Sequence, residues 1–186
     1  MGEASDSVID DLYGRLMANL NPVPDAGADE KTHLPSYISG YFDGEGCFSV
    51  ALSPRAKLRA GWEVRPSVSV SQNTDRSEVL WEIQQYFGCG TIRPDRSDYT
   101  VKWEVRNSAL LRLRVLPHFR QFPLRSSKQH DVDLICEICE RMAGGDHLEP
   151  ATLIPIVTLA GMMNPSGIRK YVIAEITSEL QSQMKA

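Results

Sequence analysis

The chain has 186 residues, of which 42% are hydrophobic and 24% are charged, a composition typical of a folded globular protein rather than a disordered one. Its longest apolar stretch, residues 151–163, contains a proline and is shorter than a bilayer span requires, so we expect no membrane segment. The first residues lack the basic and apolar regions of a signal peptide, which predicts an intracellular protein that is not secreted.

The net charge of −4 conceals an uneven distribution along the chain. Residues 1–46 contain 2 basic and 9 acidic side chains, residues 47–130 contain 14 and 7, and residues 131–186 contain 4 and 8. The middle segment therefore has the charge expected of a phosphate-binding surface. Arginines scattered over a solvated surface would give the same counts, so charge alone leaves both interpretations open.

The four cysteines indicate free thiols in a reducing compartment, because a chain of this size needs no disulfides to fold. Cys136 and Cys139 form a C-x-x-C pair on an apolar, helix-spaced pattern, whereas Cys47 and Cys89 are isolated. Since no second close pair completes a zinc site, we expect buried core thiols at 136 and 139, with metal or redox chemistry as the alternative.

Residues 1–32 are expected to form an N-terminal extension. A short amphipathic pattern at residues 8–17 is followed by a linker-like segment at residues 21–27 that contains two prolines and a glycine. We therefore divide the chain into this extension and one domain over residues 33–186.

The first helix of the domain begins near Pro35, a residue favoured at the first helical position. Ser36, Gly40 and Gly44 follow at four-residue spacing and share one stripe of the helix, where another backbone could approach closely. Gly44 and Gly46 are expected to end the helix.

Two carboxylates, Asp43 and Glu45, stand at the C-terminal end of this helix. That end already carries about half a negative charge, so a carboxylate there is unfavourable by about 0.3–1 kcal/mol. The pattern indicates that a positive partner comes from elsewhere.

Alternating apolar and polar residues predict a strand over residues 47–53 and, after a basic loop, a second strand over residues 62–71. Asp75 and Glu78 have the spacing of a capping box that opens a helix over residues 76–87. The remaining patterns predict strands over 90–94 and 99–106, and helices over 108–120, 127–143, 149–163 and 168–183.

These elements predict an α+β fold with an αββαββα core, in which a four-stranded antiparallel sheet has helices on one face and is followed by extra C-terminal helices. The other face could read base edges in a groove of duplex DNA, or it could be merely solvated. On this alternation it carries Ser49, Ser53, Arg65, Ser67, Ser69, Arg93, Thr100, Lys102 and Arg106.

Residues 38–46, Ile-Ser-Gly-Tyr-Phe-Asp-Gly-Glu-Gly, resemble the nine-residue motif of the LAGLIDADG homing endonucleases. The match keeps the motif's order of hydrophobic, small, acidic and glycine positions, and a strand pattern follows it. Residues 70–76, 128–129, 163–165 and 169–170 resemble further elements of the family, so the similarity extends well beyond the motif.

The resemblance implies a site-specific endonuclease that hydrolyses phosphodiesters in both strands of a long, pseudo-palindromic DNA site. The second acid of the motif, here Glu45, would bind Mg²⁺ or another divalent cation such as Mn²⁺ beside the scissile phosphates. By the same resemblance Gln72 would position water, Lys128 would offset charge on the phosphate, and Arg76 would support the solvent network.

Two further points come from the same resemblance. Asp43 would have a structural role, helping the paired helix ends. The position of the lysine stays open, because Arg125 or Ser126 could align in place of Lys128.

A single copy of the motif implies a homodimer, with the stripe of Ser36, Gly40 and Gly44 at the two-fold axis. Each sheet would then lie in the major groove of one half-site. The residues expected to contact DNA are Ser49, Ser53, Arg55, Arg65, Ser67, Ser69, Arg93, Thr100 and Lys102.

Two other classes of function remain as alternatives. A catalytically inactive DNA-binding regulator or an RNA-splicing maturase would keep the fold and lose the chemistry, with RNA as the less favoured partner. An unrelated interaction module with an accidental motif match is the third interpretation. The sequence identifies neither the target site nor whether the gene is in an intron, in an intein or free-standing.

Overall fold

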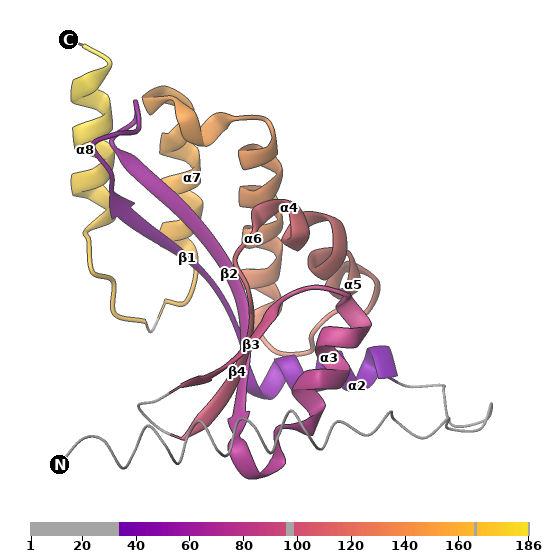
Figure 1. Ribbon diagram of the computed structural model, residues 1–186. Helices are drawn as coiled ribbons and strands as arrows, with labels where there is room; N and C mark the ends of the chain where they lie inside the picture. Colours follow the sequence, from indigo (N-terminus) through magenta and orange to yellow (C-terminus); the bar gives the residue numbers. More distant parts are fainter. Residues whose placement is uncertain (1–33, 96–98, 166, 186) are drawn as a thin grey trace, which may run out of the picture. The chain divides into compact units, whose positions relative to one another are not determined.

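The computed structural model describes residues 34–95, 99–165 and 167–185. The predicted extension over residues 1–32 lies outside these residues. The described chain has the predicted α+β class, with helices and a four-stranded antiparallel sheet (Figure 1). Its elements in chain order are α2 (Leu34–Glu45), β1 (Gly46–Pro54), β2 (Trp62–Asn73), η1 (Thr74–Arg76), α3 (Glu78–Phe87), β3 (Thr91–Asp95), β4 (Thr100–Val105), α4 (Ser108–Leu110), η2 (Leu111–Val115), α5 (Leu116–Gln121), α6 (Lys128–Ala143), η3 (Asp146–Leu148), α7 (Pro150–Met162) and α8 (Ile173–Gln183).

The strands lie in the order β1-β2-β4-β3, and every neighbouring pair is antiparallel. The alternation predicted from the sequence is confirmed. Phe48 stands opposite Val68, and Val70 stands opposite Trp103, and all four side chains are buried. The apolar side chains therefore share one face of the sheet, and their polar neighbours share the other.

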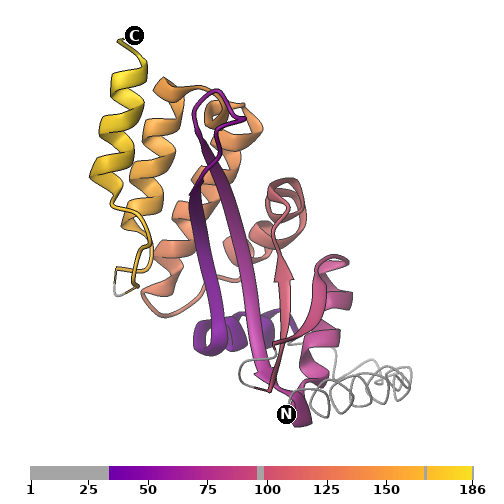
Figure 2. The same cartoon turned by 60° about the vertical axis from the view of Figure 1, so that its left-hand side comes forward.

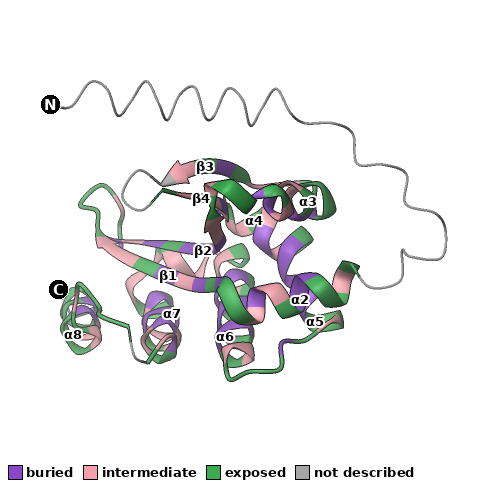
Figure 3. Cartoon of the chain, turned by 90° about the horizontal axis from the view of Figure 1, so that it is seen from below, coloured by how far each residue is buried: buried purple, intermediate pink, exposed green. Residues whose placement is uncertain are grey.

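Helices cover the apolar face of the sheet. α6 and α7 pack against β1, α3 packs against β3 and β4, and α8 packs on α7. Figure 2 shows α6 and α7 beside the long β1–β2 hairpin, and Figure 3 shows both helices on one side of it. None of the described helices is long and apolar enough to cross a bilayer.

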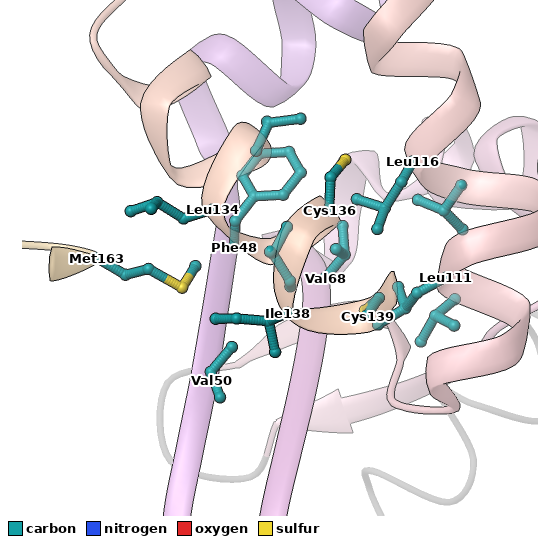
Figure 4. Packing of buried hydrophobic residues seen from close by; sticks show 14 of the residues in the cluster. Phe48, Val50, Val68, Leu111, Leu116, Leu134, Cys136, Ile138, Cys139 and Met163 are labelled. Carbon is teal, nitrogen blue, oxygen red and sulfur yellow. The ribbon is translucent and has the colours of Figure 1, made fainter. Parts of the chain in front are cut away.

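The two thiols of the C-x-x-C pair lie in the core, as expected. Cys136 and Cys139 on α6 are free and buried, and Figure 4 shows both sulfur atoms among apolar side chains from the strands and neighbouring helices. Burial raises the pKa of the Cys139 thiol to about 12, so this group stays protonated at neutral pH.

Of the two glycines predicted to end the first helix, the structure confirms Gly46 and not Gly44. Gly44 does not end the helix, which continues to Glu45, and β1 begins at the next residue, Gly46. A Cβ atom at Gly46 would lie 2.6 Å from the carbonyl oxygen of Phe42, so only glycine fits where the chain turns back against its own helix.

The predicted capping box at Asp75 and Glu78 is wrong. The chain instead forms the short 3-10 helix η1, and α3 begins after Ser77 without a side-chain cap. Thr74 explains the difference, because its backbone N–H and its hydroxyl both donate to the carbonyl oxygen of Tyr99, at 3.3 and 2.6 Å. This contact with the segment before β4 holds Thr74 at the start of η1. The helix α3 therefore begins at Glu78 and not at the predicted residue 76.

The helix predicted over residues 108–120 is interrupted. The short α4 is followed by the π-helical turn η2, and α5 begins only at Leu116. Pro117 has no N–H to donate to a regular helical ladder, and the wider turn precedes it.

The helix predicted from residue 168 begins instead at Ile173. Side chains hold the preceding segment in another path. The Arg169 guanidinium donates to carbonyls at the end of α7, and the Tyr171 ring packs edge-on against Trp62 with the ring centroids 5.2 Å apart.

Asn164 joins three parts of the fold after α7. Its backbone N–H donates to the Asp131 carboxylate at 2.9 Å, and its side-chain Nδ2 donates to the carbonyl oxygen of Phe48 on β1 at 2.7 Å. Its φ of 44° is in the left-handed region, which asparagine adopts more readily than most residues. The segment after α7 is thereby attached to the outer edge of the sheet.

Candidate active site

Glu45 is the last residue of α2 and is exposed to solvent. Its side-chain carboxylate lies at the C-terminal end of the motif helix, and the next residue, Gly46, is the first of β1. Because the helix C-terminus carries partial negative charge, this carboxylate stands in a region that attracts cations.

Lys128 supplies the positive partner that the sequence indicated. Its Nζ atom donates to the carbonyl oxygens of Asp43 at 2.8 Å, Phe42 at 3.2 Å and Gly44 at 3.4 Å. An ammonium group has three donors, and here all of them point at the last turn of α2. The structure thus places the Lys128 charge at the same helix end as Glu45.

The Asp43 side chain is hydrogen-bonded to the segment that precedes α6. Its carboxylate accepts hydrogen bonds from the backbone N–H of Arg125 at 2.9 Å and of Ser126 at 3.2 Å, and from the Ser126 hydroxyl at 2.5 Å. The Ser126 hydroxyl is the largest of the interactions that lower the pKa of Asp43. The structure therefore separates these three positions: Arg125 and Ser126 hold Asp43, while Lys128 reaches the helix carbonyls.

Gln72 reaches the same helix from the end of β2. Its Nε2 donates to the Tyr41 hydroxyl at 2.7 Å, and its Oε1 accepts from the backbone N–H of Asn73 at 2.8 Å. Burial raises the pKa of Tyr41, and Glu45 is among the nearby groups that add to this effect. Tyr41 on α2 is thus hydrogen-bonded to Gln72 and is electrostatically coupled to Glu45.

The structure does not join Arg76 to this group. Its Nε lies 3.6 Å from the Asp75 carboxylate in η1, and its side chain is 67% exposed. Within the described part of the chain, no hydrogen bond or ion pair connects it to Glu45, Gln72 or Lys128. The role expected for Arg76 stays a prediction.

The predicted stripe on α2 is open. Ser36, Gly40 and Gly44 are all exposed, and a Cβ atom at either glycine would meet nothing within 4 Å. A hollow of about 750 Å³ lies beside the stripe, bordered by Gly40 and by residues 121–125 of the segment that holds Asp43. This face of the helix is therefore accessible to another backbone.

The residues expected to contact DNA lie on the polar face of the sheet or in its β1–β2 turn. The register places Ser49 opposite Ser67, and Arg93 opposite Lys102. Ser69 shares this face but is only 7% exposed, so it offers little surface to a ligand. Glu104, which the sequence analysis did not select, lies on the same face opposite Ser69.

A buried histidine behind α2 was also missed. Ser39 Oγ donates to the carbonyl oxygen of Phe122 at 2.6 Å and lies 3.1 Å from His118 Nε2, while His118 Nδ1 lies 3.0 Å from the Tyr86 hydroxyl. Burial lowers the pKa of His118 from 6.5 to about 4. We therefore assign a neutral ring that donates through Nε2 to Ser39 and accepts from Tyr86.

Fold and site together define an α+β protein with an open polar sheet face and a motif helix that ends in an exposed carboxylate. A family model described as LAGLIDADG endonuclease matches residues 38–139, which is more than half of the chain. The chain belongs to the LAGLIDADG endonuclease family.

Relatives with curated names include intron-borne proteins. Over 116 residues the chain is 31% identical to the "Uncharacterized 50.9 kDa protein in ND4 intron 1" of Podospora anserina, a match that covers 61% of this chain and 25% of that protein. It is 25% identical over 146 residues to "DNA endonuclease I-CvuI" of Chlorella vulgaris, covering 77% of this chain and 87% of that one. The match thus spans about a quarter of the Podospora protein.

Solved structures that are similar to this one include two homing endonucleases. The homing endonuclease I-TnaI superposes with a TM-score of 0.68 at 28% identity, covering 80% of this chain and 97% of that chain. I-SmaMI, bound to an uncleaved DNA target in the presence of calcium ions, superposes with a TM-score of 0.69 at 27% identity, but the match covers 48% of that chain.

Proposed function

We propose that this protein is a homing endonuclease that acts as a homodimer on a long, pseudo-palindromic duplex and hydrolyses both strands with a divalent cation. The observation that carries the proposal is the exposed Glu45 carboxylate at the end of a helix whose outer stripe is open. A second copy packed on that stripe would bring two such carboxylates together.

The proposed homodimer is supported by the motif helix. The described residues contain one such helix, and the match accounts for 97% of I-TnaI but 48% of I-SmaMI. Two copies of the described domain would therefore provide about the amount of structure found in one I-SmaMI chain. The intron-borne relatives favour an intron origin for this gene as well.

The donors at the site fit a hard divalent cation. Within the described residues, no group of three or more His, Cys, Asp or Glu side chains could hold a metal ion. We therefore assign one ligand in each chain, the exposed Glu45 carboxylate, because the Asp43 carboxylate is engaged by Arg125 and Ser126. Two copies and the phosphate oxygens of the substrate would supply the oxygen ligands that Mg²⁺ prefers, and Mn²⁺ fits the same donors. When bound, the cation would activate water and stabilise charge on the phosphate.

The chain's own residues would complete the site. Lys128, which donates to the carbonyl oxygens of the last turn of α2, would offset the charge that develops on the phosphate. Gln72, held by Tyr41 and Asn73, has a fixed amide that can orient water. Arg76 would act from farther away, in the solvent around the site.

Replacing Glu45 tests the proposal directly. For Glu45→Gln we expect the cleavage rate with Mg²⁺ to fall roughly 100- to 10,000-fold, because several kcal/mol of transition-state stabilisation are lost. Affinity for the duplex, measured in Ca²⁺, should change little. Glu82→Gln, which changes an exposed glutamate on α3, is the matched control.

The substrate for this test comes from in vitro selection of cleaved duplexes from a random library. Unchanged cleavage by Glu45→Gln would refute the metal-ligand assignment. A wild-type protein that binds duplex but cleaves none with Mg²⁺ or Mn²⁺ would instead identify an inactive regulator or an RNA-splicing maturase.

A further inference from the structure

A carboxylate lies between two arginines on the polar face of the sheet, on strands remote in sequence from the motif helix. Glu104 Oε2 accepts from Arg93 Nη2 at 2.8 Å and from Arg106 Nε at 3.0 Å. Its Oε1 accepts from the Ser67 hydroxyl at 3.1 Å. The Glu104 side chain is 10% exposed, whereas those of Arg93 and Arg106 are 52% and 60% exposed. The carboxylate is thus covered while both guanidinium groups remain accessible.

The Glu104 carboxylate is ionised at neutral pH. Burial alone would raise its pKa, but the hydrogen bonds from Ser67 and Arg106 and the charges of both arginines outweigh burial, so the pKa is lowered. An ionised carboxylate fixes the two arginines by charge-assisted hydrogen bonds. Glu63 on the same face is more exposed, at 29%, and accepts a hydrogen bond from one arginine, Arg55, at 3.2 Å, while Arg65 Nε lies 3.9 Å away.

Each guanidinium keeps donors for a ligand. Arg106 contacts Glu104 through Nε, so this contact leaves the N–H groups of both terminal nitrogens available to a ligand. Arg93 uses one N–H of Nη2 and retains the rest of its fork. A pair of parallel N–H donors matches the O6 and N7 acceptors that guanine presents in the major groove. The three charged residues line an open hollow of about 450 Å³, so the donors border a recess that a base edge can enter.

We propose that Glu104 is a positioning residue that holds Arg93 and Arg106 ready to read two guanines in each half-site of the DNA target. The inference rests on the proposed function and narrows its substrate to sites with guanine at two defined positions. Fixing the arginines before DNA arrives reduces the side-chain entropy lost on binding and therefore increases discrimination between bases.

Two other interpretations of the cluster make different predictions. Glu104 could in principle accept from the amino group of cytosine, but both of its oxygens already accept hydrogen bonds and little of it is exposed. The arginines could instead contact phosphates. Phosphate contacts carry no sequence information, so their loss weakens binding equally for all sequences.

The test is selection of bound duplexes from a random library in Ca²⁺ by the full chain and its variants. Wild type should select guanine at two positions in each half-site. Arg106→Ala should lose guanine preference at one of them and Arg93→Ala at the other, by roughly 5- to 150-fold at the affected base. Glu104→Gln should weaken the preference at both positions while the affinity for unrelated duplex stays equal or rises, because a negative charge is removed.

Glu137→Gln is the matched control, because Glu137 also pairs with an arginine, Arg141, at 2.9 Å but lies on α6 away from the sheet face. It should leave the selected bases unchanged. The inference is overturned if Arg93→Ala and Arg106→Ala weaken binding uniformly, with a shallower salt dependence and unchanged base preferences. If Glu104→Gln does not fold, the two arginine variants, which alter exposed side chains, decide the question.

The test of the two arginines can fail without the test of the proposed nuclease failing, because the two use different measurements. Cleavage of the selected duplex with Mg²⁺ tests the nuclease, whereas base preference in Ca²⁺ tests the arginines. A nuclease whose base preferences ignore both arginines overturns the inference alone.

Discussion

At the residue scale, the last turn of α2 shows how one chain tolerates two carboxylates at a helix C-terminus. Lys128 donates to the carbonyl oxygens there, and two backbone N–H groups and a hydroxyl bind Asp43. These contacts offset the partial charge of the helix end and the charge of Asp43. Glu45 is left exposed, which suits the ligand role that we propose for it.

His118 predicts how stability depends on pH. Its pKa is about 4 in the folded chain instead of 6.5, so the folded state binds fewer protons than the unfolded state between these values. The contribution of His118 to stability is therefore complete above about pH 6.5 and falls as the pH decreases, by at most about 1.4 kcal/mol per pH unit.

Urea denaturation between about pH 7 and pH 5 at fixed protein concentration measures this slope. We expect His118→Gln to flatten it, and to lower stability at pH 7 because a buried hydrogen-bond chain is altered. His130→Gln, at an exposed position on α6, is the control. An equal slope in wild type and His118→Gln would show that His118 is not the group responsible.

The catalytic candidates predicted from the sequence differ in how closely the structure associates them with the motif helix. Glu45 came from the motif, and Lys128 and Gln72, which came from the wider resemblance, both contact the motif helix, while their roles stay predictions. Arg76 has no such support, because its side chain turns toward Asp75. Glu104 and Arg106 share the alternation of one predicted strand, so their common face was readable from the sequence. The second partner, Arg93, comes from β3, and its contact depends on strand order and register, which no local pattern contains.

At the element scale, the junction of α2 and β1 depends on Gly46. In Gly46→Ala the added Cβ would lie 2.6 Å from the Phe42 carbonyl oxygen and from a carbon of its ring. Because backbone must move to relieve this contact, we expect a loss of about 1–3 kcal/mol in the free energy of unfolding.

Chemical denaturation of Gly46→Ala beside Gly144→Ala checks this expectation. At Gly144 the nearest atom to an added Cβ is 3.4 Å away, an ordinary contact, so little change is expected. Equal stability of both variants and wild type would contradict the close approach at the junction. Reduced cleavage by Gly46→Ala should accompany the loss, because Glu45 directly precedes this residue.

The boundaries of helices and strands were predicted correctly where neighbouring residues determine them. They were missed where contacts between distant parts of the chain determine them. The alternation of β1 and β2 follows from side chains within each strand, and it placed both faces correctly. The start of α3 was missed because Thr74 binds Tyr99, and the start of α8 was missed because Arg169 and Tyr171 have partners elsewhere in the fold. Such contacts exist only after the chain has folded.

At the scale of the whole molecule, Gly40 tests the proposed dimer. An added Cβ at this position meets nothing within 4 Å in the single chain, so the fold of each copy should persist in Gly40→Leu. Across a two-fold axis it would force the helices apart and cost about 1–3 kcal/mol, which raises the dimer dissociation constant roughly 5- to 150-fold.

Sedimentation velocity and cleavage assays of Gly40→Leu measure both effects, and we expect them to fall together. Ala151→Leu, at an exposed position on α7, is the size-matched control. A Gly40→Leu protein that sediments as a dimer and cleaves at the wild-type rate would place the interface elsewhere.

The outer edge of β1 has a consequence for association in solution. A long strand at the border of a sheet presents unpaired carbonyl groups that can recruit a foreign strand and start aggregation. The Asn164 amide occupies one of these acceptors, the Phe48 carbonyl, and the segment around it runs along the same border. A single asparagine thus discourages growth of the sheet from molecule to molecule at this border, which differs from the helix face where we propose that two copies pair.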